Sequence, residues 1–133
     1  MVQEALSLAA QVPASWPGSL PEFLVYQELE RRGYDHGVDF TYQSPLMGGR
    51  TIKGGVVVDF VFNNPPDLAI GVQGTFWHYE QGVEVKARDI LAREQLAGLG
   101  VTLIFIDEDD ILEDAEHYVA EALRYRDHSR LGR

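Results

Sequence analysis

The sequence contains no cysteine, and this absence excludes three kinds of chemistry. No disulfide can form, no thiolate can bind zinc, and no cysteine can act as a nucleophile, which is typical of a protein in a reducing, intracellular compartment. The sequence also lacks an uninterrupted apolar run of about 18 residues, the length that a membrane-spanning helix needs. Its first basic residue is Arg31, so the basic start of a signal peptide is missing. We therefore expect a cytoplasmic protein without membrane contact.

Basic residues are few. There are 11 Lys and Arg residues against 21 Asp and Glu residues, which gives a formal net charge of −10 and argues against a polyanionic partner. The excess is local, because residues 107–121 contain eight acids and no Lys or Arg, and the rest of the chain has 13 acids and 11 bases. This acidic segment is either a solvated helix face or a negative surface that repels nucleic acid or engages a basic partner.

The length of 133 residues fits one domain, and hydrophobic periodicity predicts the order of its elements. Ser19, with Glu22 three residues later, has the pattern of a capping box and predicts a helix that ends at Gly33. The pattern then predicts three strands, a helix, a strand and a helix. The expected ranges are 20–32, 38–46, 56–62, 68–75, 84–99, 101–106 and 111–126, after a short apolar helix at 1–10.

This order of elements implies an α/β fold in which helices flank a mixed central sheet. The prediction of a mixed sheet rests on three consecutive strands that are followed by a crossover helix and another strand. We expect one domain over residues 1–133, with a core at about 19–107 and an acidic C-terminal helix within about 108–128.

Asp59 is the first candidate for chemistry, because it is the one charged residue in a strand that is otherwise β-branched or aromatic. A carboxylate in such a strand is costly unless it is paired or holds a cation, although a satisfied structural aspartate remains an alternative. Strand alternation places Asp59 on the same face as Val57 and Val61, opposite Val58 and Phe60.

The segment after the third predicted strand is the second candidate, because it is crowded with aromatic residues. Phe76 and Trp77 have two explanations, either packing in the core or a loop, or a platform on which bases stack. His78 would lie just past the end of a strand next to that of Asp59, a favourable position for a proton carrier.

Two further acids have both a structural and a functional explanation. Asp89 lies on the second predicted helix between Lys86 and Arg93, a spacing that is also that of an exposed ion-pair ladder. Glu22 is favoured in the first turn of its helix by the helix dipole. Neither residue is specific to a function by itself.

Together these residues resemble a known family. The string Gln-Gly-Thr-Phe-Trp-His at 73–78 resembles the His-Gly-Cys-Phe-Trp-His segment of the very short patch repair (Vsr) endonucleases, which nick DNA beside a T:G mismatch. The likeness extends in register over residues 20–106, about two-thirds of the chain. The other matching features are Glu22 with Gly33 eleven residues later, Val-Asp-Phe-Val at 58–61, Arg88-Asp89, and Leu99-Gly100 before the last apolar strand.

The resemblance implies the PD-(D/E)xK, restriction-endonuclease-like core, a mixed sheet flanked by helices. It also implies a catalytic set, shared with related phage homing endonucleases, that consists here of Glu22, Asp59, His78 and Asp89. Asp59, helped by a backbone carbonyl near Val72, would bind Mg²⁺ or Mn²⁺. The residues expected to contact DNA are Gln73, Phe76, Trp77, Arg50, Lys53, Lys86, Arg88 and Arg93.

The sequence departs from the family pattern at several positions. Gln73 replaces a histidine, and the cysteines of the family's structural zinc site are absent, so zinc is not expected. No basic N-terminal arm precedes Arg31. The wider nuclease superfamily carries a Glu and a Lys where this chain has Gly71 and Gln73.

Two functions remain open from the sequence. The first is a Mg-dependent endodeoxyribonuclease whose binding to DNA by this domain alone is weak and salt-sensitive, unless a homodimer or a protein partner contributes. The second is a catalytically inactive nuclease-fold module, with a structural or protein-interaction role in a phage or mobile-element assembly. A phage-encoded protein would act in the host cytoplasm.

Overall fold

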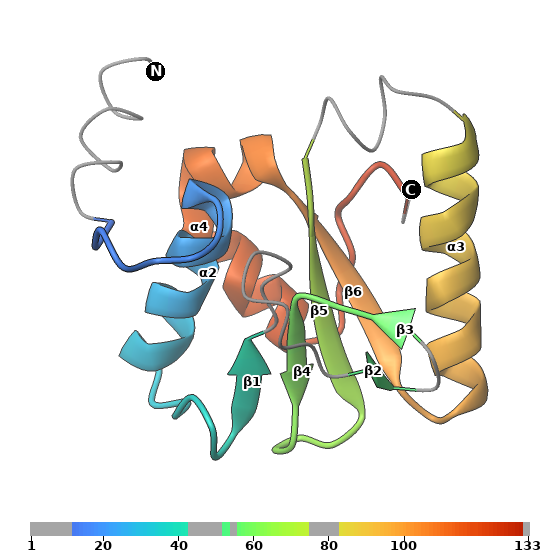
Figure 1. Cartoon of the computed structure of the whole chain (residues 1–133), viewed down its shortest axis with the longest axis horizontal. Helices are drawn as coiled ribbons and strands as arrows, with labels where there is room; N and C mark the ends of the chain where they lie inside the picture. Colours follow the sequence, from blue (N-terminus) through green and yellow to red (C-terminus); the bar gives the residue numbers. More distant parts are fainter. Residues whose placement is uncertain (1–11, 43–51, 54–55, 75–82, 132–133) are drawn as a thin grey trace.

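The computed structural model describes residues 12–42, 52–53, 56–74 and 83–131 (Figure 1). The helix expected at residues 1–10 lies outside these ranges. The elements follow the predicted order, except that β2 is added and the strand predicted at 56–62 is divided into β3 and β4. They are α2 (Leu20–Arg31), β1 (Phe40–Tyr42), β2 (Ile52–Lys53), β3 (Val56–Val57), β4 (Phe60–Phe62), β5 (Leu68–Gln73), α3 (Val83–Gly98), β6 (Thr102–Asp107) and α4 (Glu108–Leu123).

The main sheet is mixed, as predicted, and its strands lie in the order β1-β4-β5-β6. β4 is antiparallel to both β1 and β5, whereas β5 and β6 are parallel. Two parallel neighbours cannot be joined by a tight hairpin, and α3 supplies the connection between them. β2 and β3 form a separate antiparallel pair.

The strand predicted at 56–62 is two strands rather than one. The chain bends at Asp59, so that β3 pairs with β2 while β4 joins the main sheet. The bend also interrupts the alternation of side chains. Val58 packs in the same apolar cluster as Val61, so the prediction that they face opposite sides of the sheet is wrong.

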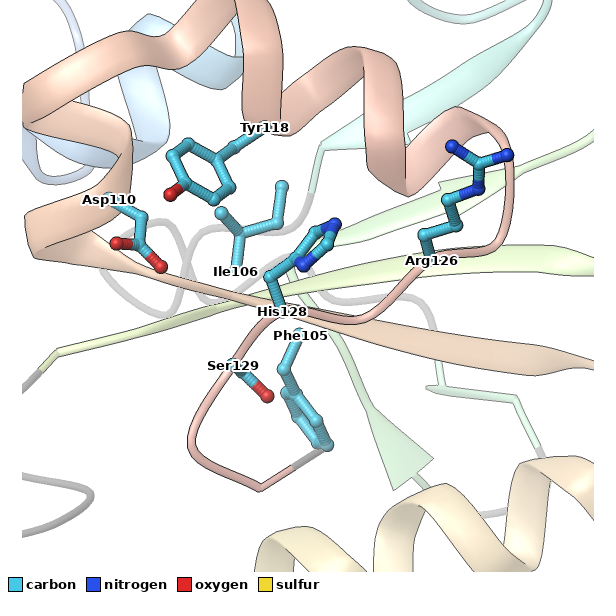
Figure 2. A pocket seen from close by; sticks show the side chains of 7 residues that line it. All are labelled: Phe105, Ile106, Asp110, Tyr118, Arg126, His128 and Ser129. Atoms are coloured by element: carbon cyan, nitrogen blue, oxygen red, sulfur yellow. The ribbon is translucent and has the colours of Figure 1, made fainter. Parts of the chain in front are cut away.

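Each face of the sheet has its own apolar cluster. Phe60 and Ile106 belong to the larger cluster, which α2 and α4 cover, whereas Val61 and Phe105 belong to the smaller one, which α3 covers. Figure 2 shows that the successive β6 residues Phe105 and Ile106 point to opposite faces. Both are more than nine-tenths buried, and burial of such a side chain contributes roughly 1.5–3 kcal/mol.

The helix boundaries follow from local chemistry. The predicted capping box at the start of α2 is present, with Ser19 as the cap and Glu22 as its partner. α4 begins at Glu108, three residues before the predicted start, and is kinked at Asp114, whose carboxylate accepts a hydrogen bond from the His117 N–H. α4 ends at Leu123 rather than near residue 126, because Tyr125 takes a left-handed conformation with φ of 64°. None of the described helices has the length and apolarity that crossing a membrane requires.

Candidate active site

Asp59 lies at the bend between β3 and β4 and lines a pocket of about 180 Å³. Its Oδ2 accepts a hydrogen bond of 2.7 Å from the backbone N–H of Val72, which holds the carboxyl group against β5. Burial raises the pKa of Asp59 well above its ordinary value, and the charge of Glu22, a side-chain hydrogen bond with Glu22, and the charge of Asp89 raise it further. The Val72 N–H acts in the opposite direction.

Glu22 reaches Asp59 from the first turn of α2. Its Oε1 accepts hydrogen bonds from the N–H and the hydroxyl of Ser19, at 3.0 and 2.8 Å, and its Oε2 accepts one from the hydroxyl of Tyr42 at 3.1 Å. The helix cap therefore fixes the carboxylate that interacts with Asp59. The two explanations of Glu22 are compatible, because the same side-chain position caps α2 and interacts with Asp59.

Asp89 comes from α3, on the other face of the sheet. It is partly buried, lines the same pocket as Asp59, and contributes to the raised pKa of Asp59. Three of the four predicted catalytic residues, from α2, the β3–β4 bend and α3, are therefore brought to one place. Like-charged carboxylates gathered in this way favour binding of a proton or a cation.

Two residues of β5 complete the wall of the pocket. Gln73 is only 2% exposed, and its Oε1 has no hydrogen-bond partner within the described part of the chain. Gly71 lies against the ring of Phe105, and a Cβ atom at this glycine would stand 3.1 and 3.2 Å from two ring carbons. The space that a longer side chain at position 71 would enter is thus taken by Phe105.

The residues of this pocket fit a hard divalent cation. Carboxylate and carboxamide oxygens line it, and oxygen donors are the ligands that Mg²⁺ and Mn²⁺ prefer. The volume corresponds to about six water molecules, enough for a partly hydrated ion. Val72 contributes its N–H to Asp59, and the metal-binding role of a carbonyl near Val72 stays a prediction.

The predicted DNA contacts are placed only in part. Arg88 is exposed on α3. The guanidinium group of Arg93 donates to the backbone carbonyl of Leu131 at 3.0 Å and lies 6.0 Å from the ring centroid of Phe105. Lys53 and Lys86 are placed by their backbone alone. Arg50, Phe76, Trp77 and the predicted proton carrier His78 lie outside the described residues.

Sequence reasoning missed Tyr42 and Phe105. Tyr42 alternates with Phe40 in β1, which indicates a side chain on the helix-covered face, but nothing in the sequence names its partner Glu22. Phe105 lies in an apolar run in which each residue has the same local pattern. The parallel register pairs Phe105 with Gly71, and only the sheet makes this visible.

A second group of acids lies at the junction of β6 and α4. Asp107, Asp109 and Asp110 each offer one oxygen atom within 4.8 Å of the others. The guanidinium group of Arg130 already pairs with Asp107 at 3.1 Å and with Asp109 at 2.8 Å. A cation here would have to compete with Arg130, so this group fits a metal ion less well than the pocket at Asp59 does.

Comparison with known proteins identifies the fold. No protein-family model and no curated protein matches the sequence. The structure resembles the catalytic domain of the homing endonuclease I-Bth0305I, with a TM-score of 0.55 and 18% identity, over 81% of this chain and 97% of that domain. This chain therefore shares the fold of that domain. The likeness agrees with the mixed sheet and flanking helices that the sequence predicts.

Proposed function

We propose that this protein is a metal-dependent DNA endonuclease with a Vsr-like active site in a single domain of residues 1–133. The observation that carries the proposal is the position of Asp59, which lines one pocket with Asp89 and Gln73 and whose carboxyl group also interacts with Glu22 of α2. A structural aspartate would be expected to have a cationic partner or several donors. Asp59 instead has two neighbouring acids that raise its pKa.

Asp59 would hold Mg²⁺ or Mn²⁺ at the bend between β3 and β4. When bound, such a cation polarises the scissile phosphate and lowers the pKa of a water molecule. The Val72 N–H would hold the Asp59 carboxyl group in place against β5 while the cation binds. The pairing of Asp59 with Glu22 also explains why a cation would bind here, since two adjacent carboxylates repel each other without one.

The remaining residues would position the water and move the proton. Glu22, held by Ser19 and Tyr42, would accept a hydrogen bond from the attacking water. His78 is the proposed general base or acid, and Asp89 would orient His78 or Gln73. Phe76 and Trp77 would stack on bases or insert between them.

The charge distribution limits how DNA would bind. The exposed acids of α4 lie on the side of the sheet opposite α3, which carries the exposed Arg88 (Figure 1). DNA would therefore approach from the α3 side. The few available cations predict weak, salt-sensitive binding, strengthened by a homodimer or a protein partner.

One observation favours the alternative of an inactive nuclease-fold module. Phe105 fills the space beside Gly71, where the wider superfamily has a carboxylate. A module of this kind would have a structural or protein-interaction role in a phage or mobile-element assembly. It would retain the fold and would not cleave any nucleic acid.

A nicking assay separates the two functions. Supercoiled plasmid and mismatched, branched and single-stranded DNA would be incubated with Mg²⁺ or Mn²⁺ and with the wild type, Asp59→Asn, or the control Asp35→Asn. Asp35 is exposed on a turn, so the same chemical change there tests for a general loss of one charge. We expect nicking by the wild type and by Asp35→Asn, and its loss in Asp59→Asn. Cleavage that survives Asp59→Asn would reject the assignment, and no cleavage by the wild type would favour the inactive module.

A further inference from the structure

We infer that the carboxamide oxygen of Gln73 is a second protein ligand, beside Asp59, for the divalent cation of the pocket, an inference that rests on the proposed function. Gln73 thereby supplies from β5 the oxygen that the sequence lacks at Gly71. Its role is to bind the cation or the water shell around it, rather than to contact DNA.

The first argument is the state of the Gln73 side chain. It is almost completely buried, yet its Oε1 has no hydrogen-bond partner within the described part of the chain. Buried acceptors in folded proteins are almost always satisfied, and an exception calls for a ligand or an ordered water. Gln73 lines the pocket that also contains Asp59 and Asp89, so a cation or its water shell is in position to satisfy this oxygen.

The second argument is the chemistry of the neighbouring groups. Across the parallel ladder Gln73 is paired with Asp107, whose carboxylate is an acceptor that Arg130 already engages. A carboxylate cannot donate a hydrogen bond to Oε1. The Val72 N–H, the next donor along β5, is taken by Asp59. Neither of these two neighbouring groups can therefore satisfy Oε1, whereas a cation or its water shell can.

The third argument is the contact between Gly71 and Phe105. Positions 71 and 73 lie on the same face of β5. A Cβ atom at position 71 would stand only 3.1 Å from the nearest carbon of the Phe105 ring. The Phe105 ring therefore leaves little room for a side chain at position 71. Gln73, two residues closer to the end of β5, is the next position on this face from which a side-chain oxygen can reach the pocket.

Cation binding without DNA tests the inference. Calorimetric titration with Mn²⁺ and with Mg²⁺, together with thermal unfolding, would compare the wild type with Gln73→Met, in which the side chain has a similar volume and no oxygen atom. We expect the dissociation constant of Gln73→Met for Mn²⁺ to rise about tenfold. The unfolding temperature of the cation-free variant should stay the same or rise, because an unpartnered buried acceptor is removed. Gln95→Met on the exposed face of α3 is the matched control and should bind Mn²⁺ like the wild type.

Gln73→Glu tests the same inference through an expected gain of affinity for Mn²⁺. This variant also provides a test if Gln73→Met does not fold. A carboxylate at this position should bind Mn²⁺ about tenfold more tightly and unfold at a lower temperature without the cation. The inference is overturned if either folded variant binds Mn²⁺ within twofold of the wild type, or if the wild type binds no cation.

The nicking assay separates this failure from that of the proposed function. If the wild type cleaves DNA, Asp59→Asn does not, and Gln73→Met binds Mn²⁺ normally, only the role of Gln73 is rejected. If the wild type neither cleaves DNA nor binds Mn²⁺, the proposed function is rejected as well.

Discussion

The hydroxyl of Tyr42 donates a hydrogen bond of 3.1 Å to Oε2 of Glu22, and the indole of Trp16 stacks on the Tyr42 ring with centroids 4.7 Å apart. The other oxygen of Glu22 is held by Ser19. Both oxygens of this carboxylate are thus oriented before any substrate binds, at the position where it interacts with Asp59. Such preorganisation is what a group that positions a water molecule needs.

Tyr42→Phe removes this hydrogen bond while keeping the aromatic packing. We expect nicking to fall about tenfold, because Glu22 becomes less well oriented, and the free energy of unfolding to fall by about 1 kcal/mol. Plasmid nicking and urea unfolding measure the two effects. Tyr34→Phe is the control, since Tyr34 packs edge-on against Phe62, away from the site. Unchanged nicking by Tyr42→Phe would show that Tyr42 does not position Glu22.

Asp59→Asn should change the pH dependence of stability. Because the folded state raises the pKa of Asp59, the folded protein holds this proton more tightly than the unfolded chain. Stability therefore falls as the pH rises from the ordinary pKa of an aspartate, about 4, through the raised value in the folded protein. Asp59→Asn abolishes this loss, so we expect it to be more stable than the wild type at pH 8 by roughly 0.5–2 kcal/mol.

Thermal unfolding in a chelating buffer between pH 4 and pH 8 measures this difference. The advantage of Asp59→Asn should shrink toward pH 4, where Asp59 is protonated in the folded state and about half protonated in the unfolded chain. Asp35→Asn, on an exposed turn, should show no such trend. Added Mg²⁺ should stabilise the wild type more than Asp59→Asn. An Asp59→Asn variant that is less stable than the wild type at pH 8 would contradict a strained, cation-binding Asp59.

The fold could be predicted from the sequence because its signals are local. The capping box at Ser19 and Glu22 and the periodicity of each element need no knowledge of the partner element. The bend at Asp59 was not predictable in this way. The residues on both sides of Asp59 have high β propensity and predict one continuous strand, whereas the chain bends because β3 and β4 pair with different strands.

The sequence was enough to name candidate site residues, but it could not show which residues they contact. Glu22, Asp59 and Asp89 stand out by type and by family resemblance, whereas their partners come from distant segments. Tyr42 and Phe105 look like ordinary core aromatics in the sequence, and their roles arise from the order of strands in the sheet. Long-range pairing of this kind leaves no local pattern.

The contact between Gly71 and Phe105 predicts a coupled pair of substitutions. Gly71→Ala places a methyl group about 3.1 Å from the Phe105 ring, and we expect it to destabilise the protein by roughly 1–3 kcal/mol. Phe105→Leu leaves room and should reduce this cost. Denaturant unfolding of the two single variants and the double variant measures the coupling. Additive effects would mean that the ring does not limit position 71.

Arg88 and Arg93 should behave differently although both lie on α3. Arg93→Ala loses the hydrogen bond to Leu131 and the contact with Phe105, so we expect destabilisation by about 1–2 kcal/mol. Arg88→Ala should leave the free energy of unfolding unchanged, because Arg88 is exposed. It should weaken DNA binding and reduce the slope of log binding constant against log salt concentration by about 1. Unfolding and salt-dependent binding to a labelled duplex separate the two. Equal salt slopes for the wild type and Arg88→Ala would remove Arg88 from the DNA contacts.

Asp127 protects the outer edge of the sheet. β6 is an edge strand, and Oδ2 of Asp127 accepts a hydrogen bond of 2.9 Å from the Phe105 N–H, while Oδ1 accepts one of 2.9 Å from the Ser129 N–H. An unpaired edge strand favours pairing with a second chain. Asp127→Ala should therefore destabilise the protein by about 1–3 kcal/mol and increase its aggregation on heating. Asp127→Asn keeps one acceptor and should lose less. Light scattering during thermal unfolding compares the aggregation of both variants with that of the wild type. Equal aggregation by Asp127→Ala and the wild type would show that the rest of the C-terminal segment covers the edge without this side chain.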